Sequence, residues 1–224
     1  MRVLIVNPVG HSTWDEQDKR TYEEFASQGT EIVVRSLSEG PMSIETPEAH
    51  AEVTYRVVKL VKEIHEGFDG VIVNCFFDPG VDMLKGMIKQ PVVGPCESSL
   101  ALASLIGRKV LVASVGNEAL WIIDDRIRQL GLSSFVVGIK GIPYGVLDID
   151  SDRDGVKKAL ISVINKEIRA RGVDVAVLGC TGLAGLAREV QKAVGIPVID
   201  PAGAALKTLE GLIKLGLHNG LFGK

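Results

Sequence analysis

The chain has 224 residues, of which 46% are hydrophobic, so it can bury a large core as one domain or as two smaller ones. Its net charge of −3, without a basic segment, argues against a nucleic-acid partner, and no run reaches the roughly 18 apolar residues of a membrane span. Three cysteines without close spacing predict neither disulfides nor a zinc site, and a strand-like N-terminus argues against a signal peptide. We therefore expect a cytoplasmic protein with no membrane partner.

Apolar runs alternate with helical patterns through the first half of the chain. Thr13 and Glu16 are typical of a capping box before the first helix, and Thr46 is the expected N-cap of the second. Asp78 is likewise the expected N-cap of a helix that starts at Pro79. Strands are expected at residues 2–6, 31–35, 71–75 and 91–94, and helices at residues 14–28, 47–64, 79–89 and 95–106.

The second half follows the same plan. Asp200 precedes Pro201, which is the arrangement expected of an N-cap and the first residue of a helix. Because strands and helices alternate throughout, the sequence predicts parallel sheets that are covered on both faces. Strands are expected at residues 109–113, 134–139, 173–179 and 196–199, and helices at residues 117–130, 154–171, 183–194 and 201–215.

The two halves repeat each other. Cys180 follows Cys75 by 105 positions, and each cysteine stands at the end of an apolar run. The strand at residues 3–6 returns at residues 110–113, and the PVVGP segment at 91–95 returns as PVIDP at 197–201. Three matches in the same order and at nearly the same offset indicate an internal duplication.

The duplication predicts an α/β fold of two similar lobes. We expect each lobe to be a Rossmann- or flavodoxin-like parallel sheet, with a pseudo-two-fold axis between the lobes and the active site in the cleft that they form. The first lobe is predicted to comprise residues 1–95 together with a C-terminal helix, residues 201–224, that crosses back to it. The second lobe is predicted to comprise residues 96–200.

One cysteine in each half, at matched positions, is the main chemical signal. Both stand where a strand ends and a helical turn follows, and the positive end of a helix favours a thiolate over a thiol. A lone cysteine at such a place is more often a small buried apolar residue, but a matched pair across a pseudo-two-fold axis favours a functional role. Two opposed thiols suit proton removal on one face of a carbon and proton delivery on the other. Cys75 and Cys180 are therefore candidate acid and base.

Several motifs resemble those of the aspartate/glutamate/hydantoin racemase superfamily, and the resemblance is strongest to its hydantoin and allantoin racemase branch. They occur in the family's order and span most of the chain. The matching segments are Asn7-Pro8, NCFFDPG around Cys75, GPCES at residues 94–98, GRKVLV from Gly107, VLGCTG around Cys180 and PVID at residues 197–200.

The resemblance implies a cofactor-independent racemase, without a metal, in which Cys75 and Cys180 alternate as acid and base. It further implies a small-molecule substrate, foremost a 5-substituted hydantoin, and leaves a homo-oligomer open. The alternatives are an aspartate/glutamate-type racemase, a related isomerase or decarboxylase, and a non-catalytic binding domain. The implied substrate-binding residues are Asn7, Asn74, Phe76, Ser114, Gly116, Thr181 and Gly182.

The remaining candidates are weaker. Cys96 has no counterpart in the second half, so we expect it to be a packing residue. Glu97 matches an acid of the family, although a first-turn glutamate that stabilises the helix dipole explains it equally well. Asp78 is expected to be an N-cap rather than a base, and His11 to be a surface-turn residue near the cleft.

Overall fold

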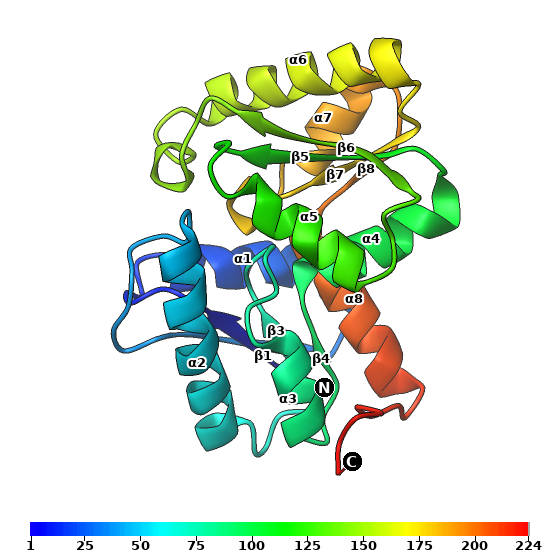
Figure 1. Ribbon diagram of the computed structural model, residues 1–224. Helices are drawn as coiled ribbons and strands as arrows, with labels where there is room; N and C mark the ends of the chain where they lie inside the picture. Colours follow the sequence, from blue (N-terminus) through cyan, green and yellow to red (C-terminus); the bar gives the residue numbers. More distant parts are fainter. Residues whose placement is uncertain (224) are drawn as a thin grey trace.

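The computed structural model describes residues 1–223, which form two four-stranded parallel sheets (Figure 1). The strand order of the first sheet is β2-β1-β3-β4 and that of the second is β6-β5-β7-β8, so the duplication predicted from the sequence is a duplication of topology. The strands are β1 (Arg2–Asn7), β2 (Glu31–Ser36), β3 (Gly70–Val73), β4 (Val92–Val93), β5 (Val110–Val115), β6 (Val136–Ile142), β7 (Val175–Leu178) and β8 (Val198–Ile199).

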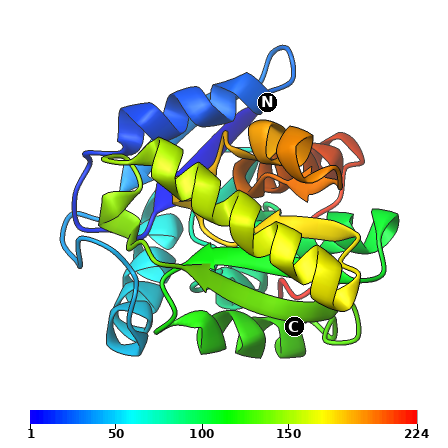
Figure 2. The ribbon, with the colours of Figure 1, turned by 90° about the horizontal axis from the view of Figure 1, so that it is seen from above.

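Helices cover both faces of each sheet, as the alternation of strands and helices predicts. Figure 2 shows α6 lying across the outer face of the second sheet. The helices are α1 (Asp15–Phe25), α2 (Pro47–Ile64), α3 (Val81–Met87), α4 (Pro95–Ile106), α5 (Leu120–Gln129), α6 (Arg153–Arg171), α7 (Ala187–Val194) and α8 (Pro201–Lys214), with 3₁₀ turns η1 (Val146–Asp148) and η2 (Thr181–Leu183).

The central strands are apolar at every position because both of their faces are buried. On β1, Leu4 and Val6 point towards α2 and α3, whereas Val3 and Ile5 point towards α1 and α8. On β5, alternate residues likewise divide between α6 with α7 and α4 with α5. This pattern is the period-two alternation of a strand applied to a sheet without a solvent face.

The two lobes exchange their last helices. The buried face of α4, which follows β4 of the first sheet, packs against β5 and β7 of the second sheet. The buried face of α8, which follows β8 of the second sheet, packs against β1 and β3 of the first (Figure 1). The exchanged helices also contact each other, so they tie the two sheets together. The exact lobe boundaries stay a prediction.

Three details of the predicted helix starts are wrong. Helix α1 begins at Asp15 after Trp14, and no side chain caps it, so Thr13 and Glu16 form no capping box. Helix α3 begins at Val81 rather than at Pro79, after a left-handed Gly80. Asp78 has a φ of 51° and does not cap that helix. The capping motif missed the start of α3 because the chain makes a tight turn after Cys75 before it becomes helical.

Two predicted N-caps are confirmed. The Thr46 side chain accepts a hydrogen bond from the Ala49 N–H at the start of α2. The Asp200 carboxylate accepts hydrogen bonds from the N–H groups of Ala202 and Gly203, which are otherwise unpaired at the start of α8.

None of the helices within residues 1–223 is long and apolar enough to cross a membrane.

Candidate active site

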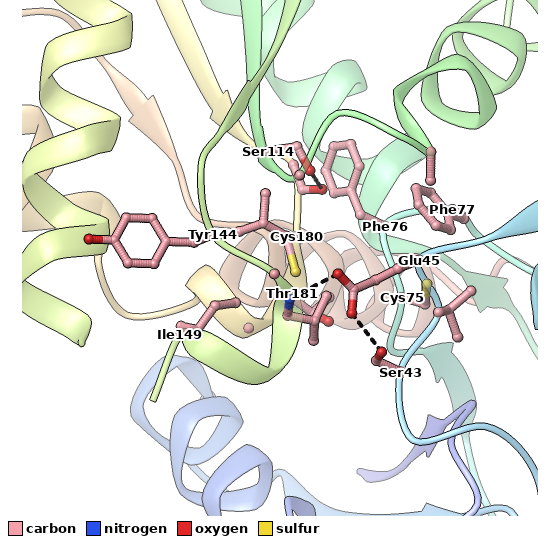
Figure 3. Close-up of a pocket in the computed structure, with 18 of the residues that line it drawn as sticks. Ser43, Glu45, Cys75, Phe76, Phe77, Ser114, Tyr144, Ile149, Cys180 and Thr181 are labelled. Atoms are coloured by element: carbon pink, nitrogen blue, oxygen red, sulfur yellow. Dashed lines mark hydrogen bonds between the residues drawn. The ribbon is translucent and has the colours of Figure 1, made fainter. Parts of the chain in front are cut away.

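A cavity of about 370 Å³ lies between the two lobes, at the ends of the central strands. This is the edge at which ligands bind in open α/β sheets. Cys75 and Cys180 both line the cavity, and in the view of Figure 3 the Glu45 side chain is drawn between their sulfur atoms. All nine residues named from the sequence line it together: Asn7, Asn74, Cys75, Phe76, Ser114, Gly116, Cys180, Thr181 and Gly182.

The two cysteines sit in equivalent turns. The residue before each cysteine pairs with the first strand of its own sheet: the Asn74 N–H donates to Val6 and the Gly179 N–H donates to Ala113. Three residues after each cysteine, an N–H group donates back to the cysteine carbonyl, at 2.9 Å for Cys75 and 3.1 Å for Cys180. The repeated turn aims both side chains into the space between the lobes.

Backbone N–H groups approach both thiols, but burial has the larger effect. Burial raises the pKa of the Cys75 thiol well above its ordinary value, against a hydrogen bond from the Phe77 N–H. Burial also raises the pKa of Cys180, to about 11, against hydrogen bonds from the Gly182 and Leu183 N–H groups. The expectation that the helical turns favour thiolates is therefore wrong. Each sulfur contacts the cavity but has protein on its other sides, so a charge there loses hydration.

A charge on one thiol also affects the other. A charge on Cys180 raises the pKa of Cys75, since two anions in one poorly hydrated cleft repel each other. The pair therefore favours at most one thiolate at a time. Both cysteines, like Cys96, are free thiols.

The predicted polar residues of the first lobe, Asn7 and Asn74, are hydrogen-bonded to each other. The Asn74 side-chain N–H donates to the Asn7 Oδ1 at 2.7 Å, and the Tyr22 hydroxyl donates to the Asn74 Oδ1 at 2.9 Å. The Asn7 Nδ2 donates to both Asp15 and Asp18. Both amides are buried, and this network fixes the turns after β1 and β3 relative to α1.

Asp18 is a lining residue that the sequence did not reveal. Burial raises the pKa of its carboxyl group to about 7, and the neighbouring charges of Asp15 and Asp150 raise it too, while the hydrogen bond from Asn7 lowers it. Asp18 therefore carries a proton for part of the time at neutral pH. No sequence signal marks it, since an acidic residue in the first turns of a helix is ordinary.

The predicted residues of the second lobe lie opposite this network. The Ser114 hydroxyl donates to the Gly179 carbonyl at 2.8 Å and so joins the end of β5 to the turn after β7. Gly116 has a φ of 61°, which a side chain would strain, and its N–H donates to the end of β6. The Thr181 hydroxyl donates across the cleft to the Asn74 carbonyl at 3.3 Å.

Glu45 is the second lining carboxylate that the sequence analysis missed. It extends from the loop between β2 and α2 into the cleft (Figure 3). It accepts a hydrogen bond from the Ser43 hydroxyl at 2.6 Å and from the Val146 N–H of the other lobe at 3.2 Å. Its charge also raises the pKa of Cys180. A loop glutamate just before a helix cap carries no signal for this position.

The weaker candidates lie outside the cavity. Cys96 is fully buried among the apolar residues of α4, α5 and the second sheet. Glu97 bonds to the Gly94 N–H and pairs with Lys85 and Arg126, so it belongs to the start of α4. His11 contacts the Met42 carbonyl and does not line the cleft. Within residues 1–223 no three His, Cys, Asp or Glu side chains are grouped as metal ligands would be.

The fold and the site define a two-lobed α/β enzyme whose cleft receives one cysteine from each half of a duplicated chain. Comparison with known proteins agrees: residues 3–209 match the family described as Asp/Glu/Hydantoin racemase. The chain belongs to this family, and it is an isomerase of the racemase type, as the sequence motifs predict.

Individual relatives match over nearly their whole length. The hydantoin racemase of Paenarthrobacter aurescens is 29% identical over 218 residues, which are 96% of this chain and 92% of that protein. Allantoin racemase from Pseudomonas fluorescens superposes with a TM-score of 0.94 at 28% identity, over 98% of this chain and 94% of the other. Allantoin racemase from Klebsiella pneumoniae superposes with a TM-score of 0.93 at 26% identity, over 100% of this chain and 94% of the other. The similarity to the hydantoin/allantoin branch is therefore confirmed.

Proposed function

We propose that the protein racemises a 5-substituted hydantoin, with Cys75 and Cys180 as the two acid–base groups. The observation that carries the proposal is the matched pair of thiols, one from each lobe, on a single inter-lobe cavity. Inversion of a carbon centre requires a base on one face and an acid on the other, and a pseudo-two-fold axis supplies such a pair.

Two sulfur atoms can carry out both proton transfers of the reaction. A thiolate takes the hydrogen from the ring carbon, so a C–H bond breaks and an S–H bond forms, and the electron pair moves into the adjacent carbonyl as an enolate. The opposite thiol then gives its proton to the other face of the carbon and becomes the thiolate. The repulsion between the two charges disfavours the form with two thiolates, so the cycle uses one thiolate and one thiol. Proton exchange with solvent resets the pair.

The charge of the cleft favours a neutral ring over a free amino acid. Four acidic residues line the cavity, Asp18, Glu45, Glu118 and Asp150, and no described lining residue is Lys, Arg or His. An anionic substrate such as aspartate or glutamate would enter this cavity without an opposing side-chain charge, which is costly where water is excluded. A hydantoin carries no carboxylate and offers N–H donors to acidic groups. The named hydantoin and allantoin racemases among the relatives support the same substrate class.

The test is deuterium exchange in heavy water with single enantiomers. We expect L- and D-5-benzylhydantoin, 5-isopropylhydantoin or allantoin to lose optical rotation and to gain one deuterium at the ring carbon. We expect no exchange of aspartate or glutamate at the same concentrations. Exchange of the amino acids without exchange of any hydantoin would overturn the substrate class, and no exchange of either would favour a binding domain or a different reaction.

A further inference from the structure

A buried arginine of the second lobe binds the segment that follows Cys75. Arg126 on α5 is only 6% exposed, and its Nε donates to the Asp78 carboxylate at 3.2 Å. The same guanidinium bonds to Asp82 on α3 and, at 2.9 Å, to Glu97 on α4. No lining residue of the catalytic cavity belongs to this cluster, so these contacts lie behind the cysteine rather than beside the substrate.

Asp78 connects Arg126 to the cysteine. Its N–H donates to the Cys75 carbonyl at 2.9 Å, which closes the turn that carries the thiol. Its carboxylate accepts the N–H groups of Cys96 and Glu97, both at 3.0 Å, at the start of α4. The N-cap residue of that helix is Gly94, which has no side chain, so Asp78 supplies the missing acceptor from another segment.

The left-handed backbone of Asp78 supports a positional role. Its φ of 51° is an uncommon conformation for a residue with a side chain, and it persists only where the surroundings determine it. The carboxylate occupies the space beside Gly94, where a β-carbon would come within 2.0 Å of its Oδ1. The turn after Cys75 is thus held by contacts to α4 and α5, which both pack on the second sheet.

The turn after Cys180 is held by different residues. The residue that occupies the place of Asp78 after Cys180 is Leu183, whose side chain is fully buried in the apolar core of the second lobe. Arg153 donates to the Ala184 carbonyl at 2.7 Å, and the Gly185 N–H donates to the Asp200 carboxylate at the start of α8. The two turns therefore have separate contacts, and those of Arg126 belong to the Cys75 side.

We propose that Arg126 is a positioning residue for Cys75, acting through Asp78, and that it has no comparable effect on Cys180. This inference rests on the two-cysteine function proposed above. Arg126 offsets the buried carboxylate charges and holds the turn against the second lobe. Without its full set of contacts the turn loses its anchor, and a shift of about 1 Å in a reacting group can cost on the order of 100-fold in rate.

The test measures deuterium exchange separately for each enantiomer. The enantiomer whose hydrogen faces Cys180 can lose it to that sulfur and regain deuterium from it, whereas the opposite enantiomer needs Cys75 for the first step. In Arg126→Lys and in Asp78→Asn we expect the exchange rate of the Cys75-dependent enantiomer to fall by at least about tenfold relative to that of the other enantiomer. Cys75→Ser and Cys180→Ser assign each enantiomer to its sulfur.

The ratio of the two exchange rates is unaffected by partial unfolding, because unfolding lowers both rates by the same factor. The matched control is Arg128→Lys, since Arg128 lies on the same helix, is 67% exposed and, within residues 1–223, pairs only with Asp124. We expect its ratio to equal that of the wild type. A ratio within about twofold of the wild type in both Arg126→Lys and Asp78→Asn would overturn the inference.

Failure of the proposed function gives a different result. If the wild type exchanges no hydantoin, the proposed function is wrong. The role of Arg126 in holding the turn after Cys75 is then tested by peptide-resolved alkylation with iodoacetamide. We expect Arg126→Lys to raise the alkylation rate of Cys75 relative to Cys180 by at least about threefold, because a loosened turn exposes the sulfur. An unchanged or lower relative alkylation rate would contradict the role of Arg126 in holding this turn.

Discussion

Cys75 and Cys180 occupy equivalent turns but have different surroundings. Two N–H groups approach the Cys180 sulfur and one approaches Cys75, and the Asp78 carboxylate further raises the pKa of Cys75. Burial raises the pKa of both thiols most, and the carboxylates Glu45 and Asp18 further raise the pKa of Cys180.

Replacing either cysteine by serine is expected to abolish racemisation and leave the fold intact. A serine hydroxyl is a far weaker acid than a thiol, so one face of the ring carbon loses its proton carrier. Polarimetry should give less than a few per cent of the wild-type rate for Cys75→Ser and for Cys180→Ser. Each variant should still exchange deuterium on the one enantiomer that its remaining sulfur serves. Substantial racemisation in either variant would contradict the two-base mechanism.

Cys96→Ala is the matched control for the cysteine pair. Cys96 is buried in the apolar cluster behind the site and lines no part of the cavity. We expect wild-type turnover and a loss of at most about 1 kcal/mol in the free energy of unfolding, as for a small buried truncation. A large loss of turnover with normal thermal unfolding would mean that the wrong thiol has been assigned.

At the scale of elements, the exchanged helix α8 is fastened to the first lobe by a buried carboxylate. Glu210 accepts hydrogen bonds from the Ser27 N–H, the Ser27 hydroxyl and the Thr30 hydroxyl, and it pairs with Lys207. Burial alone would raise the pKa of Glu210, but these hydrogen bonds outweigh it and lower the pKa to about 2. The contact joins the turn between α1 and β2 to the last helix.

Glu210→Gln should reduce stability in a pH-dependent way. The folded-state pKa of Glu210 lies below its ordinary value of 4.5, so its stabilisation is present above pH 4.5 and is lost as the pH falls towards 2. We expect urea unfolding to give a deficit of about 2 kcal/mol at pH 7 that narrows between pH 4.5 and pH 3. The exposed Glu24→Gln on α1 should show no deficit at either pH. A deficit independent of pH would assign the effect to packing instead.

At the scale of the whole molecule, direct contacts between the lobes surround the cleft. Besides the hydrogen bond from Thr181 to Asn74, the Gln17 side chain donates to Asp150 at 3.2 Å, and Glu45 accepts from the Val146 N–H. Each contact joins a segment of one lobe to a segment of the other, and all six residues line the cavity.

The separation of the two sulfurs is a prediction for the closed, substrate-bound state. A carbon that receives protons on both faces needs each sulfur at about 3–3.5 Å, so the two should stand about 7 Å apart. A disulfide requires about 2 Å between sulfurs. We expect a crystal structure with a bound hydantoin to give the longer distance, and mild oxidation of the intact protein to leave Cys75 and Cys180 unlinked. A disulfide between them formed without unfolding would contradict this geometry.

The sequence by itself determined the alternation of strands and helices, the duplication and the place of each cysteine at a strand end. These features depend on hydrophobic periodicity and turn residues, which act over a few positions, and on a repeat that is visible in the chain. The family motifs around Cys75 and Cys180 are likewise local. For this reason the α/β fold and the candidate cysteine pair could be predicted without coordinates.

Only the tertiary structure decided what surrounds the pair. The exchange of α4 and α8, the entry of Glu45 and Asp18 into the cleft and the contact of Arg126 with Asp78 join segments far apart in sequence. The sequence predicts a local helix cap at Asp78, but the N–H groups that donate to its carboxylate lie on α4, nearly twenty residues later. The thiols appeared to favour ionisation because sequence reveals the N–H groups of a turn but not the loss of water around it. Desolvation is a property of the whole packed cleft, and here it outweighs the local hydrogen bonds.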